Sequence, residues 1–204
     1  MNERNKSKFA RKVLRLLAAK YGPVSGAAPH RFTPWQLLVA TILSAQATDK
    51  SVEKATAELF RHYKSIESFS RLRPAQLYKY TKSIGLYRAK SSNIIKAAKM
   101  LRESYGSKVP ASMEQLVRLP GVGRKTANIV LSNAFGISEG IAIDTHCITV
   151  SNRLKLVHTK DPKKIEQELM HMLPKSEWGS VNYLFIELGR DTCTAKEKHC
   201  ERCA

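Results

Sequence analysis

Lys125 and Asp144 are the two side chains of this sequence that are best suited to covalent chemistry. Lys125 follows the segment Leu-Pro-Gly-Val-Gly-Arg at 119–124, which predicts that it lies in the first turn of a helix. The positive end of a helix and the neighbouring Arg124 both favour the uncharged form of an amine. An uncharged amine can attack a sugar C1′ atom or form a Schiff base with an opened sugar, whereas a charged one binds a phosphate. The position alone supports both interpretations equally.

Asp144 follows a short apolar run, Gly-Ile-Ala-Ile at 140–143, and precedes a helix predicted through Val150 and Leu154. Its simplest role is that of an N-cap, in which a carboxylate oxygen accepts hydrogen bonds from the free N–H groups of the first turn. A capping carboxylate that also faces a cleft can stabilise an oxocarbenium-like sugar or activate an amine. The residues alone do not establish that Asp144 and Lys125 converge.

The loop before Lys125 contains two glycines one residue apart, after a proline that ends the preceding helix. Both glycines are expected to adopt positive φ and so to allow a tight turn. The N–H groups of this loop, with the positive end of the next helix, would form a site for a DNA phosphate whose affinity falls with salt. An ordinary helix–turn–helix connection is the alternative. The residues assigned to DNA binding here are Gly121, Val122, Gly123, Arg124 and Thr126.

The composition of the chain is strongly basic. Its 204 residues include 35 lysines and arginines against 17 aspartates and glutamates, a formal net charge of +18. This excess favours a polyanionic partner such as nucleic acid, although a ribosome-associated or merely basic protein has the same composition. A hydrophobic fraction of 43% excludes a wholly disordered chain. No apolar run approaches the roughly 20 residues that span a bilayer, so we do not expect an integral membrane protein.

The N-terminal segment is rich in arginine and poor in acidic residues, as transit peptides are, but it lacks the apolar core of a signal peptide. Phe9, Val13, Leu16 and Leu17 have the spacing of one helix face, which favours a folded amphipathic helix. The cysteines are too few for a disulfide framework in a chain of this length. We therefore expect a cytoplasmic, nucleoid-associated protein in a reducing compartment.

Signals for helix starts and ends recur along the chain, and no segment shows the alternation of a half-buried strand. Capping boxes begin at Thr33 and Ser112, and the second is expected to open a helix that reaches Arg118. Other predicted helix boundaries are Asp49, Pro74, Gly106, Arg124 and Asp161. The predicted fold class is therefore all-α.

Several motifs in the same order resemble those of the helix-hairpin-helix DNA glycosylases, and among these the endonuclease III family. The matching segments are LPGVGRKTAN at 119–128, AIDTH at 142–146, LSAQATD at 43–49 and IGLYRAK at 84–90. The likeness runs from about residue 11 to residue 203, which is nearly the whole chain.

The resemblance implies a bifunctional DNA glycosylase and abasic-site lyase of base excision repair. Such an enzyme removes oxidised pyrimidines such as thymine glycol from duplex DNA and acts as a monomer. By position, Lys125 is the nucleophile that forms the Schiff base before β-elimination, and Asp144 is the carboxylate that assists attack. The adenine-glycosylase relatives lack a lysine at this position, which favours lyase activity. A monofunctional glycosylase and a catalytically silent DNA-binding protein are the alternatives.

The resemblance also implies an architecture in which two helical domains flank a DNA-binding cleft. A continuous domain at 25–137 would hold the helix-hairpin-helix motif, and residues 1–24 plus 138–204 would form the second domain with the C-terminal cysteine loop. Lys125 and Asp144 then lie on either side of the join between the domains.

An enzyme of this class must swing the damaged base out of the duplex. By resemblance, Gln46 fills the gap, Leu86 is an apolar wedge between the bases, and His146 lines the base pocket. Without the family, Gln46 would be read as solvated, Leu86 as a core residue and His146 as structural.

Three cysteines gather near the C-terminus. By resemblance, Cys193, Cys200 and Cys203 match the first three ligands of the family's [4Fe–4S] cluster, and the fourth would lie five residues beyond Cys203. Such a cluster normally takes four thiolates. The alternatives are an incomplete cluster, a chain cut short before its fourth ligand, and a Cys3His zinc site that uses His199, while Cys147 is a fourth thiol by count only.

Overall fold

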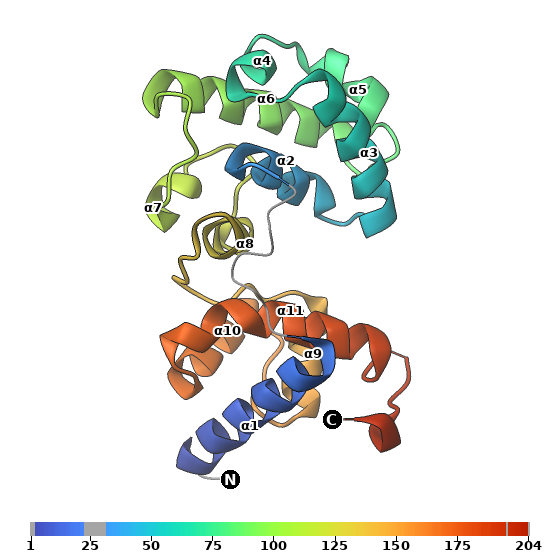
Figure 1. Cartoon of the computed structure of the whole chain (residues 1–204), viewed down its shortest axis with the longest axis vertical. Helices are drawn as coiled ribbons and strands as arrows, with labels where there is room; N and C mark the ends of the chain where they lie inside the picture. Colours follow the sequence, from blue (N-terminus) through green and yellow to red (C-terminus); the bar gives the residue numbers. More distant parts are fainter. Residues whose placement is uncertain (1–2, 23–31, 195, 204) are drawn as a thin grey trace. The chain divides into compact units, whose positions relative to one another are not determined.

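The computed structural model describes residues 3–22, 32–194 and 196–203, and within them every regular element is a helix (Figure 1). The all-α prediction is confirmed. The α-helices are α1 (Glu3–Tyr21), α2 (Pro34–Ser44), α3 (Asp49–His62), α4 (Ile66–Ser70), α5 (Pro74–Thr81), α6 (Tyr87–Ser104), α7 (Met113–Leu116), α8 (Arg124–Phe135), α9 (Thr145–Arg153), α10 (Pro162–Met172) and α11 (Lys175–Asp191). A short 3-10 helix, η1 (Cys200–Arg202), follows them.

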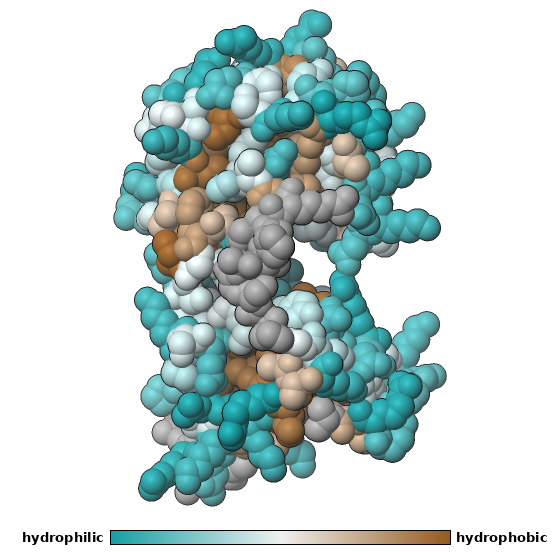
Figure 2. Space-filling view, viewed as in Figure 1, coloured by the Kyte–Doolittle hydropathy of each residue, from teal (hydrophilic) through white to brown (hydrophobic). Residues whose placement is uncertain are grey.

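The chain divides into two compact units, each with its own packed helices. One unit comprises residues 30–135 and contains α2 to α8, and the other comprises residues 1–29 with 136–204 and contains α1 and α9 to α11. Hydrophilic residues cover most of the face shown in Figure 2, as the charge of the chain requires. No helix in the described ranges is long and apolar enough to cross a membrane.

In the unit of residues 30–135, α4 and α5 pack on α6, while α2 lies against α3, α6 and α8. The start of α2 shows why this sequence is helical here. Thr33 accepts a hydrogen bond from the Gln36 N–H at 3.3 Å, and the Gln36 side chain accepts one from the Thr33 N–H at 3.0 Å. This predicted capping box is confirmed. It places the fully buried Leu38 and Leu43 on the core face.

Two predicted helix boundaries were wrong in this unit. Thr48, not Asp49, is the N-cap of α3, because its side chain accepts a hydrogen bond from the Ser51 N–H. Asp49 stands instead in the first turn, where its negative charge interacts favourably with the positive end of the helix dipole. The helix that starts after Ser112 stops at Leu116 rather than Arg118, and the Ser112 side chain makes no cap hydrogen bond.

In the second unit, α1 packs on α10 and α11, and α9 packs on α11. The buried face of α1 consists of Ala10, Leu14 and Leu17. Only Leu17 of the predicted stripe is fully buried, since Phe9 and Leu16 are 36% and 40% exposed. The predicted N-terminal helix is therefore confirmed, but the prediction of which residues form its buried face was wrong.

Candidate active site

The loop before α8 makes its turn at one glycine rather than two. Gly121 has φ +80, and a Cβ there would lie 2.9 Å from the Asn93 Cβ of α6, so both its backbone and its packing require glycine. Gly123 does not have positive φ, which corrects the prediction, and a Cβ there would meet nothing within 4 Å. The surroundings of Gly123 within the protein therefore do not explain why it is glycine.

Lys125 is exposed in the first turn of α8. The opposite face of α8 is anchored in the core of the unit, because Ala127, Val130 and Leu131 are fully buried. The first turn is closed by a hydrogen bond from the Ala127 N–H to the Gly123 carbonyl at 2.9 Å. The preceding Val122 is also buried. A rigid helix start thus presents the lysine at the surface of the unit.

Asp144 is the N-cap of α9, as predicted, and its Oδ1 accepts a hydrogen bond from the Cys147 N–H at 2.8 Å. The three residues before it are buried, and their backbone is tied to neighbouring helices. The Ile141 N–H donates to Glu166 Oε1 at 3.2 Å, and Asn182 Nδ2 donates to the Ala142 carbonyl at 2.8 Å. These contacts hold the half-buried carboxylate in one place.

His146 lies in the first turn of α9 against the backbone of α11. A Cβ on Gly189 would stand only 2.5 Å from His146 Nδ1, so the imidazole occupies the space that this glycine leaves open. Sequence reasoning did not identify Gly189. A glycine inside a helical pattern can mark such a close approach, but the helix that contains Gly189, α11, was not itself predicted.

Gln46 and Leu86 are both exposed, and both have a left-handed backbone, with φ +54 and +58. Leu86 is 67% exposed, so it is not a core residue. The two loops are neighbours, because a Cβ on Gly85 would stand 3.5 Å from the Gln46 carbonyl oxygen. A left-handed residue other than glycine costs about 1–2 kcal/mol, so the fold sustains strain at both positions.

The C-terminal thiols do not form a metal site among the residues described, where no group of three or more His, Cys, Asp or Glu side chains is placed to hold an ion. Cys193 Sγ accepts a hydrogen bond from Arg153 Nη1 at 3.2 Å, while Cys200 and Cys203 are exposed. Cys147 is buried in the core of its unit, where its Sγ donates to the Ala142 carbonyl at 3.6 Å, so it is not placed beside the exposed thiols.

The zinc alternative also lacks support from the side-chain arrangement. Both ring nitrogens of His199 lie near carboxylates, at 3.4 Å from Glu197 and 3.6 Å from Glu201. The sequence has three cysteines at a ligand-like spacing, but in the part of the chain that the structure describes their side chains do not converge on one point.

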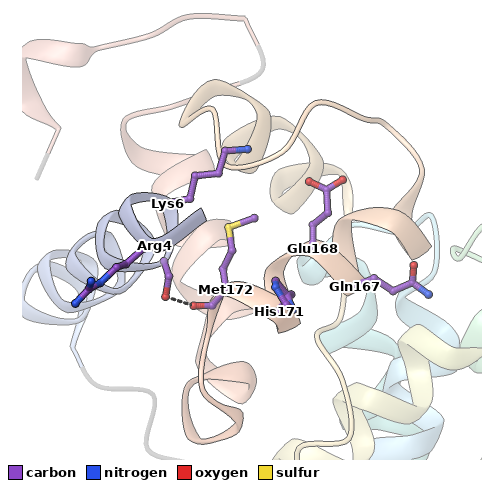
Figure 3. A pocket seen from close by; sticks show the side chains of 7 residues that line it. Arg4, Lys6, Gln167, Glu168, His171 and Met172 are labelled. Atoms are coloured by element: carbon purple, nitrogen blue, oxygen red, sulfur yellow. Dashed lines mark hydrogen bonds between the residues drawn. The ribbon is translucent and has the colours of Figure 1, made fainter. Parts of the chain in front are cut away.

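A cavity of about 490 Å³ lies between α1 and α10 (Figure 3). Lys6, Glu168 and His171 line it, and Ser7 Oγ donates to the Met172 carbonyl at its edge at 2.7 Å. None of the predicted site residues lines this cavity. The candidate site residues instead lie on the loops and helix starts described above, with Gln46, Leu86 and Lys125 in one unit and Asp144 and His146 in the other.

Comparison with known proteins identifies the family of this chain. Residues 39–175 match the family model of the HhH-GPD superfamily base excision DNA repair proteins. The chain is 45% identical over 171 residues to endonuclease III of Bacillus subtilis, covering 83% of this chain and 78% of that protein. It is 41% identical over 170 residues to endonuclease III of Thermotoga maritima, covering 83% and 79%.

A solved structure of a trapped covalent intermediate between an endonuclease III and DNA has the same fold. It superposes with a TM-score of 0.87 at 39% sequence identity, covering 97% of this chain and 92% of that one. The chain therefore belongs to the HhH-GPD superfamily of base excision DNA repair proteins and, within it, to the endonuclease III family of DNA glycosylases and abasic-site lyases.

Proposed function

We propose that this protein excises oxidised pyrimidines from duplex DNA and cleaves the strand at the abasic site, with Lys125 as the nucleophile. The observation that carries the proposal is the exposure of Lys125 in the first turn of α8, shortly after the turn at Gly121. The trapped DNA complex of a relative of the same fold supports covalent chemistry of this kind. The protein would act as a monomer on chromosomal DNA in the cytoplasm.

The loop at 121–126 would bind a phosphate of the DNA backbone. Gly123 supports this role, because the space where a Cβ would stand is open and its backbone can approach a ligand closely. The positive end of α8 and the neighbouring Arg124 favour an anion at this place. Contacts of this type set the position of the protein on DNA without reading its sequence.

Lys125 and Asp144 would carry the reaction. The Lys125 amine attacks C1′ of the damaged nucleotide, and the bond from C1′ to the base breaks with its electron pair leaving on the base, which takes up a proton. Asp144 accepts the proton that the attacking amine gives up. Ring opening forms a Schiff base, loss of a C2′ proton expels the 3′ phosphate, and water then releases the lysine.

Gln46, Leu86 and His146 would act before this chemistry. A base in the stack is reached only after extrusion, which costs a few kcal/mol of lost stacking and pairing. The exposed Leu86 is suited to enter the stack and Gln46 to fill the space left behind. His146, fixed against α11, would line the pocket of the damaged base.

The C-terminal cysteines are the ligands that a [4Fe–4S] cluster would use, together with a fourth one. Their spacing supports this assignment, whereas their arrangement among the described residues does not. The visible absorption spectrum of protein purified without oxygen is the test. A broad iron–sulfur band supports the cluster, and a colourless protein without iron excludes it.

Borohydride trapping tests the main proposal. The protein is incubated with duplex DNA that contains one thymine glycol, and sodium borohydride reduces any Schiff base to a stable adduct. We expect a covalent protein–DNA band and cleavage of the damaged strand. A folded protein that excises the base without an adduct would be a monofunctional glycosylase, and one that binds DNA without excision would be catalytically silent.

A further inference from the structure

Lys90 is a buried lysine that the chemistry above does not use. It lies in the first turns of α6 and is only 6% exposed. Its Nζ donates to the Leu43 carbonyl at 2.9 Å and also to the Ala45 carbonyl. Burial lowers the pKa of this lysine, so the fold keeps an ammonium group here against a desolvation cost.

The two acceptors of Lys90 lie at the C-terminal end of α2. The last carbonyls of a helix lack partners within the helix, and the negative end of the dipole favours a cation. Ala45 is the C-cap, and Gln46 follows it immediately in the left-handed conformation. The ammonium group therefore bonds the end of α2 at the residue immediately before Gln46.

The backbone of Lys90 is bonded to the other loop. Its N–H donates to the Leu86 carbonyl at 3.1 Å, which forms the first hydrogen bond of α6. Leu86 is the N-cap of α6 but makes no side-chain cap hydrogen bond. One residue thus joins the loop of Gln46, through its side chain, to the loop of Leu86, through its backbone.

We propose that Lys90 is a positioning residue for base extrusion, which holds Gln46 and Leu86 together in the conformation that replaces an extruded nucleotide. This inference rests on the proposed function. An apolar side chain of the same length would fill the space but would leave the end of α2 without its hydrogen-bond donor. Because Lys125 stands on a different helix, α8, the loss of Lys90 should affect extrusion and leave the covalent step intact.

The variant Lys90→Met tests this separation with two substrates. On duplex DNA with thymine glycol, we expect the single-turnover excision rate to fall about tenfold, equivalent to about 1.4 kcal/mol in the barrier. On a single-stranded oligonucleotide that already contains an abasic site, no base needs to leave a stack, so borohydride trapping should stay within about twofold of the wild type. Lys96→Met is the matched control, because Lys96 is an exposed lysine of the same helix, and both rates should be unchanged.

Two results would overturn the inference: duplex excision by folded Lys90→Met at the wild-type rate, or an equal loss on both substrates. Circular dichroism at the assay temperature establishes folding. If Lys90→Met does not fold, Lys90→Gln takes its place, because its neutral amide is one bond shorter and should not reach both carbonyls, and the same loss on the duplex substrate alone is expected. Failure of the proposed function is distinct, since wild-type protein would then give no trapped adduct on either substrate.

Discussion

The two regions that carry the proposed chemistry are built in opposite ways. The loop before Lys125 depends on backbone conformation, with one glycine turn and an exposed side chain on a well-packed helix. The segment before Asp144 depends on burial and hydrogen bonds, and the carboxylate itself caps a helix. The lysine is thus positioned by its helix, and among the described residues its side chain has no structural role of its own. The aspartate also caps α9, so an experiment on Asp144 must distinguish loss of stability from loss of catalysis.

The largest effect is expected from Lys125→Gln. Loss of the amine removes the Schiff base, so strand cleavage and borohydride trapping should fall at least about a thousandfold. Because Lys125 is exposed and its helix is anchored elsewhere, thermal stability and DNA affinity in a filter-binding assay should be nearly unchanged. Lys108→Gln changes another exposed lysine and is the control. If Lys125→Gln still forms an adduct, another nucleophile is present.

Asp144→Asn and Asp144→Ala separate the two roles of the aspartate. Asparagine is as good an N-cap as aspartate, so Asp144→Asn should keep its stability but excise thymine glycol about a hundredfold more slowly. Asp144→Ala should lose the same activity and also about 1 kcal/mol of unfolding free energy. Urea unfolding measured beside single-turnover excision checks both. Equal stability losses in the two variants would contradict the capping argument.

The glycine pair gives a matched comparison within the lysine loop. Gly121→Ala places a Cβ at positive φ and 2.9 Å from Asn93, so it should lower the free energy of unfolding by about 2 kcal/mol. Gly123→Ala meets no atom of the protein, so stability should be retained while DNA affinity falls about fivefold. Thermal unfolding and a salt titration of binding measure the difference. Unchanged affinity in Gly123→Ala would place the phosphate elsewhere.

The smallest effect concerns Asp191, at the end of α11. Hydrogen bonds from Lys20, Thr192 and Tyr21 hold the pKa of its carboxyl below the ordinary value of 3.8. A lowered carboxyl pKa stabilises the fold above the unfolded value, and this contribution disappears as the pH falls through the folded value. Asp191→Asn should therefore be slightly less stable than wild type near about pH 7 and equally stable in strong acid. A pH-independent difference would show that charge is not involved.

Much of the fold could be predicted because helix caps are local signals. The Thr33 box, the Asp144 and Asp161 caps and the left-handed Gly106 all occur as expected. Helix α11 was not predicted, since its N-cap is Pro174 without a side-chain hydrogen bond. The core face of α1 was misplaced because leucines adjacent in sequence, Leu16 and Leu17, point to different sides of a helix. Which side is buried depends on the helices that pack against α1.

The predicted site residues came from motifs, whereas the burial of the residue that positions two of them, Lys90, could not be predicted from the motif that contains it. Nothing in the sequence around Lys90 distinguishes a buried lysine from the many exposed ones, because its burial depends on α2, which is distant in sequence. The left-handed backbone of Gln46 and Leu86 was equally hidden, since neither residue type favours it. Packing between separate helices determines both features.

The position of α1 has a consequence for biosynthesis. This helix packs on α10 and α11, so its apolar face stays uncovered until residues 162–191 have been synthesised. Residues 30–135, by contrast, are complete in themselves and can fold while translation continues. A nascent chain can therefore complete the packing around the Lys125 helix, α8, before it covers the apolar face of α1.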